Sequence, residues 1–303
     1  MSSPKQRTGH YLPSGTAPAG PYSLAVTPRT DAALTWCSLR VLELSPGESH
    51  AFGSGEEEMF VLPLTGSCTV ACDGEKFAVD GRDSVFSRVT DSVYVPRDAA
   101  VVVTATGTGP GRFALPAARC TRRLAPRYRA AGDVPVEIRG AGNSTRQVNN
   151  FGSADTFDAD RLIAVEVITP AGNWSSYPPH KHDEDRPGEE SVLEEIYYFE
   201  IADGADRPST TVRGGFGFHR VYGTADRPID VLAEVRTGDV VLIPHGWHGP
   251  SVAAPGYHMY YLNVMSGPGA HREWLIRDDP AHAWVRAEWE RQDQDPRLPL
   301  TFP

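Results

Sequence analysis

The sequence predicts an all-β protein built from two small, jelly-roll-like barrels, with a short helix near the C-terminus. Three observations support this prediction. The 303 residues include 29 Gly and 26 Pro, and short runs rich in β-branched and aromatic residues lie between these turn formers. The second half of the chain repeats the order of strands in the first. The length also suffices for two domains of ordinary size.

The first half contains closely spaced strand patterns. We expect strands over residues 34–44, 58–64, 67–72, 91–96 and 100–105. A turn is expected at Thr65-Gly66, and Asp73-Gly74 is a signal for a two-residue hairpin. Short strands at this spacing are typical of a sandwich or a small barrel.

The second half follows the same plan. Strands are expected over residues 161–169, 195–201, 212–222, 231–235, 239–244 and 257–264. Glu58–Leu62 corresponds to Glu195–Phe199, and the run ending at Pro96 corresponds to the run ending at Pro244. We interpret this repeat as a duplication.

Three parts of the chain follow from this interpretation. Residues 1–30 are expected to be an extended arm, residues 31–135 a first barrel, and residues 136–303 a second barrel with a tail. The first barrel has only His50 near its equivalent of the site described below, so we expect it to hold no metal. Asp279-Pro280 is expected to begin a helix over residues 281–292 that packs Trp284 and Trp289 on the barrel or on a partner. The arm and this tail favour a homo-oligomer.

Composition excludes several classes of partner. A net charge of −10 argues against nucleic acid, because phosphate contacts need a basic surface. No apolar run reaches transmembrane length, and the N-terminus does not read as a signal peptide. The four cysteines form no C-x-x-C pair and are expected to be free thiols in a reducing cytoplasm.

The stretch from Pro178 to His248 carries the candidate chemistry. His180 and His182 lie two residues apart, so on a strand both imidazoles project from the same face. Glu195 begins a later strand, and His248 ends a Pro-x-Gly-x-His turn. Three imidazoles and one carboxylate suit a divalent zinc, manganese, iron or nickel ion.

Two of these assignments have a neighbour that competes with them. Glu194 precedes Glu195, but Glu195 shares a face with Tyr197 and therefore points inward if that ring packs inside the barrel. His245 lies in the same turn as His248, and we favour His248 because it begins the next strand.

The motifs resemble a known family. His180 and His182, Glu195 and the turn ending at His248 resemble the two cupin motifs. The segments 178–183, 194–199, 215–222, 244–250 and 256–267 look like those of the 5-deoxy-glucuronate isomerase family of inositol catabolism, and so does the donor-rich segment 139–150. That family is related to the 5-keto-4-deoxyuronate isomerases, and both are two-barrel cupins, or bicupins. The similarity covers essentially the whole chain.

The resemblance implies an aldose–ketose isomerase that converts 5-deoxy-glucuronate into 5-dehydro-2-deoxy-gluconate. One divalent ion, with zinc favoured, would be held by His180, His182, Glu195 and His248. The reaction moves a hydrogen between adjacent carbons, through an enediolate with a general base or by a hydride shift. The candidates for the base are Glu194, His219, Tyr222 and His258.

A sugar-acid substrate also needs a group that binds its carboxylate. Arg146 is the first candidate, because a guanidinium can hold a carboxylate through two bonds. Lys181 is the second, although it points opposite to its histidine neighbours in the pleat, and Asn149 is a further candidate. The acidic segment 183–190 is either a lid or a solvated loop. An Fe(II) dioxygenase and a non-catalytic sugar-acid-binding bicupin are the alternative functions.

Overall fold

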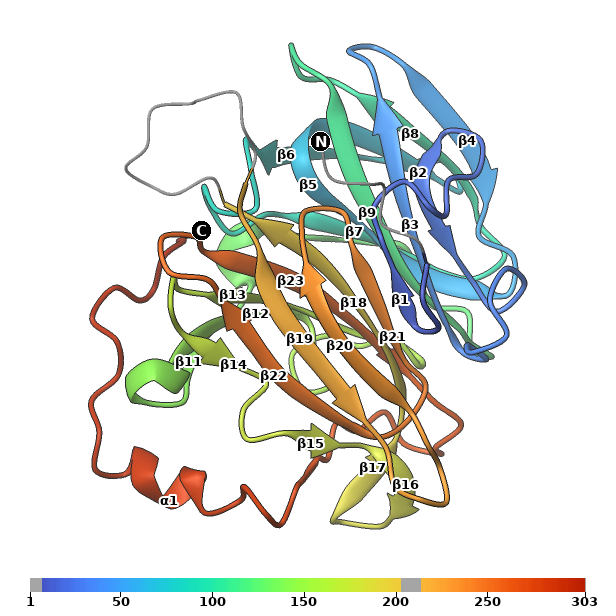
Figure 1. Ribbon diagram of the computed structural model, residues 1–303. Coiled ribbons are helices and arrows are strands. Elements are labelled where there is room, and N and C mark those ends of the chain that lie inside the picture. The colour runs from blue at the N-terminus through green and yellow to red at the C-terminus, as the bar shows by residue number, and fades with distance from the viewer. Residues whose placement is uncertain (1–6, 203–213, 303) are drawn as a thin grey trace.

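The computed structural model describes residues 7–202 and 214–302, and these residues are almost entirely β-sheet (Figure 1). The predicted all-β class is confirmed. Within the described residues α1 (Val285–Trp289) is the one α-helix, and no helix there is long and apolar enough to cross a membrane. The strands form separate sheets that pack face to face, so the jelly-roll halves are sandwiches rather than closed barrels over the described part of the chain.

Strands of the first half form one nine-stranded network. Its main path runs through β10 (Arg127–Arg129), β7 (Ser92–Val95), β5 (Glu57–Cys72), β9 (Gly111–Arg119), β3 (Cys37–Leu44) and β2 (Tyr22–Val26). Three further strands, β4 (Ser49–Gly53), β6 (Glu75–Arg82) and β8 (Ala100–Ala105), complete a second layer through pairings with β5 and with one another.

The long strand β5 corrects one prediction. The expected turn at Thr65-Gly66 does not reverse the chain. Instead β5 pairs with β7 and β9 along its first part and with β6 and β8 along its second, with register shifts in between. Such irregularities bend a strand, and the φ of +84° at Gly66 adds to the bend. The predicted hairpin is present at Asp73-Gly74, where both residues have positive φ.

Two sheets carry most of the second half. A seven-stranded sheet runs β1 (Tyr11–Leu12), β21 (Val240–Ile243), β18 (Glu194–Ile201), β23 (Met259–Ser266), β13 (Ile163–Thr169), β12 (Arg146–Gly152) and β11 (Val136–Arg139). A six-stranded sheet contains β20 (Asp230–Val235), β19 (Gly217–Tyr222), β22 (Trp247–Ala253), β15 (His180–Lys181) and β24 (Arg277–Asp278), with β14 (Trp174–Ser175) beside β22. A separate hairpin joins β16 (Asp183–Arg186) to β17 (Glu190–Val192).

The ends of the chain differ from the sequence predictions. The segment expected as an extended arm supplies β1, which pairs with β21, and β2, which pairs with β3. The tail helix is shorter than the predicted span of residues 281–292, because most of the backbone bonds that close the turns around it join residues three apart. Trp284 is 64% exposed rather than packed on the protein surface. The first two residues of the strand expected over 212–222 lie outside the described residues.

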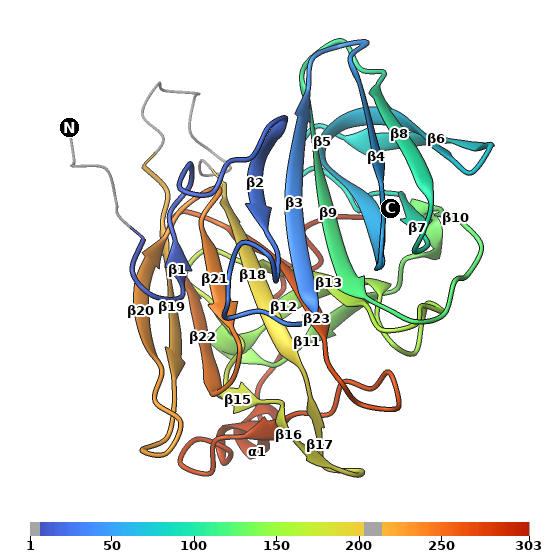
Figure 2. The same ribbon diagram turned by 90° about the vertical axis from the view of Figure 1, so that its right-hand side faces the viewer.

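Alternation along β18 separates two hydrophobic cores. Ile196 and Tyr198 point into a core that the two halves share, together with Leu39 and Phe60 from the first half. Tyr197 and Phe199 point the other way, into the interior of the second half. Figure 2 shows β3 and β9 facing β18 and β23 across the shared core. The inward side of β18 therefore faces the interior where the candidate site lies.

The repeat of the two halves is visible in strand pairing. β18 lies between β21 and β23, as β5 lies between β7 and β9. Glu195 stands opposite Ile243, the residue before Pro244, and Met59 stands opposite Val95, the residue before Pro96. The predicted correspondence of Glu58 with Glu195 is therefore wrong by one residue: Glu58 takes the place of Glu194.

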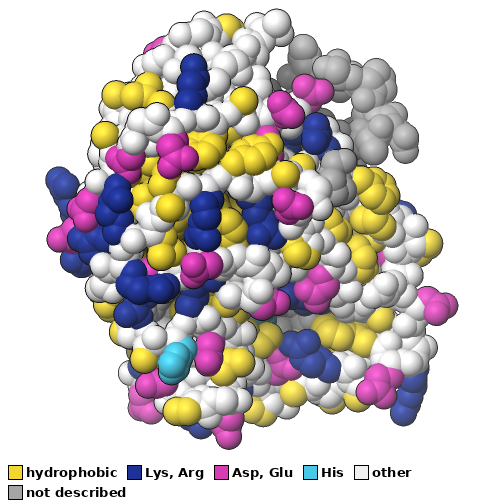
Figure 3. Space-filling model, turned by 180° about the vertical axis from the view of Figure 1, so that it is seen from behind, with side chains coloured by type: hydrophobic (Ala, Val, Ile, Leu, Met, Phe, Trp, Pro, Cys, Tyr) yellow, Lys and Arg dark blue, Asp and Glu magenta, His cyan; other side chains and the backbone are white. Residues whose placement is uncertain are grey.

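On the surface seen in Figure 3, acidic and basic side chains are interspersed.

Candidate metal centre

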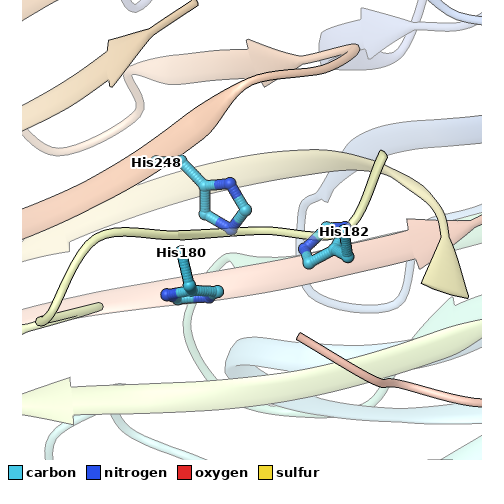
Figure 4. Close-up of side chains that lie close together, drawn as sticks. All are labelled: His180, His182 and His248. Carbon is cyan, nitrogen blue, oxygen red and sulfur yellow. The ribbon is translucent and has the colours of Figure 1, made fainter. Parts of the chain in front are cut away.

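Three histidines converge inside the second half (Figure 4). β15 pairs with β22 so that His180 stands directly opposite His248, and His182 follows β15 on the same side as His180. One ring nitrogen of each of the three lies within 4.8 Å of the others. The predicted spacing of two residues thus places His180 and His182 on one side of their segment, where both face His248 on the neighbouring strand β22.

Glu195 completes this group from the opposite sheet. Its Oε2 lies 3.2 Å from His182 Nε2 and 3.2 Å from His248 Nε2. The His180 side chain is 7% exposed and the other three are nearly inaccessible. These four residues are those predicted as metal ligands.

Backbone carbonyls fix the orientation of the three rings. Nδ1 lies 3.4 Å from Pro178 O in His180, 3.1 Å from Leu193 O in His182 and 3.3 Å from Gly246 O in His248. A carbonyl only accepts, so each Nδ1 carries a proton and Nε2 is the ring nitrogen left to bind a cation. Burial alone would lower the pKa of His182, but its contact with Glu195 raises it. Bonds of this kind are the usual support of metal-ligating histidines.

The donor set has the chemistry of a divalent metal site. Burial and the neighbouring histidines hold the pKa of His180 well below its ordinary value, so its ring is neutral. Burial opposes ionisation of Glu195, but its contacts with His182 and His248 outweigh this and hold its pKa below the ordinary value. In the part of the chain that the structure describes, Glu195 Oε1 and His248 Nε2 are buried and have no hydrogen-bond partner, and a bound cation would satisfy both. These buried residues could bind a metal ion.

Glu194 faces away from this group. Its carboxylate accepts backbone N–H bonds of 2.6–3.0 Å from Thr35, Trp36 and Cys37, just before and at the start of β3. Its position in the pleat turns it toward the first half, so the structure does not bring this candidate base to the metal site.

The first half contains the counterpart of this contact. Glu58 accepts backbone N–H bonds of 2.5–2.9 Å from Asp160, Arg161 and Leu162, which lead into β13. Each half thus inserts one buried glutamate into the segment before the equivalent strand of the other half. We call this pair, Glu58 and Glu194, the glutamate clasp.

His219 lies close to the metal ligands within the same interior. It is fully buried, its ring centroid is 4.8 Å from that of Tyr197, and its Nδ1 lies 2.8 Å from Ser251 Oγ. Its Nε2 has no hydrogen-bond partner among residues 7–202 and 214–302. Burial lowers the pKa of His219 to about 3, with a further contribution from His248, so the ring is neutral.

The remaining candidates for the base are occupied elsewhere. The Tyr222 hydroxyl donates to Asp279 in the tail. His258 Nδ1 accepts the backbone N–H of Ala171 at 3.0 Å, and its charged neighbours are Asp295 and Arg297. Among the four candidates, the structure brings only His219 into the interior beside the ligands.

Arg146 is a buried guanidinium near the histidines. It is 8% exposed and donates to the backbone oxygen of Ser144 at 3.1 Å; among the described residues no carboxylate lies within salt-bridge distance of it. Burial lowers its pKa to about 10, and its charge in turn lowers the pKa of His180. The Trp289 ring of α1 covers it at 5.5 Å.

Lys181 and Asn149 have partners of their own. Lys181 Nζ donates to Asp183, Glu184 and Glu190 at 2.6–2.8 Å and therefore binds the hairpin β16–β17. Asn149 donates to Glu166 and accepts from Gln147 on the side of β12 that faces the first half. The structure brings neither predicted substrate contact to the interior. His245 lies in the turn outside the cluster, where burial lowers its pKa.

The amino-acid sequence matches the model of the KduI/IolB family over residues 11–285. The chain belongs to this family. It is 41% identical over 254 residues to a 5-deoxy-glucuronate isomerase of Bacillus subtilis subsp. natto, across 83% of this chain and 88% of that protein. It is 41% identical over 259 residues to that of Geobacillus kaustophilus, across 82% and 86% of the two chains.

Solved structures agree with the family and the fold. An IolB-like protein from Salmonella typhimurium superposes with a TM-score of 0.81 at 33% identity, over 92% of this chain and 99% of that chain. The oxalate decarboxylase of Lactobacillus farciminis superposes with a TM-score of 0.63 at 12% identity, over 90% and 89%. This second likeness shows the cupin fold of the KduI/IolB chain and nothing of its chemistry.

Several interior residues of this KduI/IolB chain were not singled out from its sequence. Tyr197 and Tyr261 stack at 4.8 Å, and both hydroxyls meet Ser176 Oγ, at 2.9 and 3.2 Å. Asn263 Oδ1 is buried and has no hydrogen-bond partner in the described part of the chain. Period-two alternation from Glu195 and along β23 would have found the tyrosines and Asn263, because all share the inward face. Ser176 lies in an irregular segment that no such pattern reaches.

Proposed function

We propose that this chain is a metal-dependent aldose–ketose isomerase that converts 5-deoxy-glucuronate into 5-dehydro-2-deoxy-gluconate in inositol catabolism. The observation that carries the proposal is the buried set of three imidazoles and one carboxylate beside a buried arginine, Arg146, that has no carboxylate partner within the described residues. Relatives at 40–41% identity bear the name of this activity. The substrate is a sugar acid, and the cytoplasm is the proposed site of action.

His180, His182, Glu195 and His248 would hold one divalent ion. Zinc is favoured by the three imidazoles and single carboxylate, and manganese, iron and nickel fit the same donors. The oxalate decarboxylase of Bacillus subtilis, whose fold is similar, has Mn(II) centres. When bound, the ion supplies a Lewis acid that polarises the substrate carbonyl. Nε2 of each histidine is available for it because each Nδ1 is held by a carbonyl.

Arg146 would bind the substrate carboxylate. A buried guanidinium without an anionic partner is costly, and a carboxylate would offset that cost through charge-assisted bonds. The influence of Arg146 on the pKa of His180 supports a position near the ligands. The substrate would therefore lie with its carboxylate toward β12 and its carbonyl toward the histidines.

His219 would carry the proton between the two carbons. A C–H proton leaves the hydroxyl-bearing carbon and returns to the former carbonyl carbon, while one proton passes between the two oxygens, so no oxidant or reductant is needed. The neutral ring offers an unpartnered Nε2, and Ser251 fixes its orientation. His219→Gln is then expected to lower kcat by about 10²–10⁴-fold.

The test is conversion of the proposed substrate by purified protein. 5-Deoxy-glucuronate is supplied with the protein as isolated, after chelator treatment, and after each divalent metal is restored, and the ketone is followed by NMR. We expect conversion that the chelator abolishes and a metal restores. Absence of conversion with every metal would overturn the proposal, and oxygen uptake in the same samples would favour a dioxygenase.

Size-exclusion chromatography with light scattering tests the predicted homo-oligomer.

A further inference from the structure

Asp183 follows His182 directly and joins three separate segments. Its Oδ2 accepts the backbone N–H of Gly246 at 2.9 Å and a guanidinium N–H of Arg227 at 3.0 Å. Its Oδ1 accepts from Lys181 Nζ at 2.6 Å. The side chain is only 9% exposed, so these bonds lie largely out of water.

Gly246 connects this carboxylate to the third histidine. The N–H of Gly246 donates to Asp183, and the carbonyl of Gly246 accepts from His248 Nδ1 at 3.3 Å. Gly246 has a φ of +93°, and a Cβ there would lie 2.8 Å from Tyr222 O, so no other residue fits this turn. Asp183 therefore contacts the residue that orients the imidazole of His248.

Lys181 fixes the position of Asp183 from the other side. Lys181 lies between His180 and His182, and its side chain is 7% exposed. Glu190 receives the ammonium at 2.7 Å and the backbone N–H of Asp183 at 3.0 Å, so the hairpin β16–β17 is tied to the same point. The two histidines of one segment and the third histidine of another are thus linked through one buried ionic network.

We infer that Asp183 is a positioning residue that sets the distance between the His180–His182 segment and His248 through the Gly246 backbone. The pairing of His180 with His248 and the Trp247 ring, 5.6 Å from Lys181 Nζ, also join the two segments. Among the described residues, Asp183 supplies the side-chain hydrogen bond to the backbone of the turn at Gly246. Residues that hold metal ligands in this way commonly change metal affinity by about 10–100-fold. The inference rests on the metal centre of the proposed function, but not on the identity of the sugar.

The test compares metal binding by wild type, Asp183→Ala, Asp183→Asn and Asp185→Ala without substrate. Asp185 is exposed on the same hairpin and is the matched control. Zinc affinity is measured by competition with a chromogenic chelator, and the absorption of bound cobalt reports the ligand geometry. We expect affinity to fall about 10–100-fold in Asp183→Ala, with a changed cobalt spectrum. Asp183→Asn keeps one oxygen for Gly246 and is expected to fall less, and the control to match wild type.

Other outcomes separate this inference from the proposed function. Wild-type affinity and spectrum in Asp183→Ala, or an equal loss in Asp185→Ala, would overturn the inference and leave the metal centre standing. If Asp183→Ala does not fold, the isosteric Asp183→Asn decides through affinity, because it weakens the ionic contacts with Lys181 and Arg227 that hold the side chain against Gly246: a zinc affinity equal to wild type overturns the inference. Failure of the wild type to bind any divalent metal would overturn the proposed function first.

Discussion

Glu194 and Glu195 are adjacent carboxylates with different environments. The pleat of β18 sends Glu195 to the histidines and Glu194 to the N–H groups of the first half. Alternation and the ring of Tyr197 were enough to favour Glu195 from the sequence. The partners of Glu194 were not predictable, because they lie more than 150 residues away along the chain.

Removal of the Arg146 guanidinium is predicted to weaken substrate binding. Arg146→Met should raise KM and lower kcat/KM by about 10–150-fold, the range expected when one charged hydrogen-bonding partner is lost. An uncharged analogue with a hydroxymethyl group in place of the carboxylate should react equally well with variant and wild type. Arg139→Met is the control, because Arg139 is paired with Glu137 at 2.8 Å. Unchanged KM in Arg146→Met would contradict the assignment.

The burial of His219 predicts a pH dependence of stability. Its pKa is about 3 in the folded protein and ordinarily 6.5, so between these values the unfolded chain binds one proton more. Folding stability then rises with pH, and is lost as pH falls below 6.5, by up to about 1.4 kcal/mol per pH unit for this group. Urea unfolding of metal-free protein between pH 6.5 and 4 should therefore show a flatter profile for His219→Gln. Parallel profiles for the variant and wild type would contradict a buried neutral ring.

At the scale of elements, the glutamate clasp predicts a stability effect far from the metal. Glu194→Gln replaces a carboxylate that accepts three backbone N–H groups, and leaving buried donors poorly satisfied costs about 1–3 kcal/mol. The same change at Glu58 is expected to act alike. Chemical denaturation measures the free energy of unfolding of both variants. Glu189→Gln, at an exposed position, is the control, and its free energy of unfolding should stay within about 0.5 kcal/mol of wild type. If Glu194→Gln instead lost metal affinity while its stability was unchanged, Glu194 would be assigned to the metal centre rather than to the glutamate clasp.

Local patterns predicted most strands but not how they join. Periodicity located the strands around Glu195 and His248 and the hairpin at Asp73, where side-chain spacing and turn chemistry act over a few residues. The bend in β5 could not be predicted because Thr65-Gly66 has the residues of a turn. The chain continues in the same direction there because the two parts of β5 pair with strands of different layers. The tail helix was overestimated because local capping at Asp279 gives no measure of its length.

The role of the polar segment 183–190 also depended on structure. Its charges permitted a lid or a solvated loop. The structure instead shows Asp183 and Glu190 binding Lys181, which excludes Lys181 as a free substrate contact. A charge pattern identifies such groups but not their partners.

At the scale of the whole molecule, the shared core predicts that the two halves unfold together. Phe60 and Leu39 of the first half pack with Ile196 and Tyr198 of the second, and the buried Arg82–Glu166 ion pair crosses between them. Phe60→Ala should lower stability by about 3–5 kcal/mol while calorimetry still shows one transition. Val102→Ala, at an exposed position of the first half, is the control. Two separate transitions would contradict a shared core.

His248, rather than His245, is the histidine that completes the proposed metal centre with His180 and His182. The decisive measurement is a proton NMR time course with 5-deoxy-glucuronate in D₂O for wild type, His248→Ala and His245→Ala, with the metal content of each sample determined. We predict ketone formation and bound metal in wild type and His245→Ala, and neither in His248→Ala. Solvent deuterium in the product would support proton transfer over a hydride shift. Full turnover by metal-free His248→Ala would contradict the account.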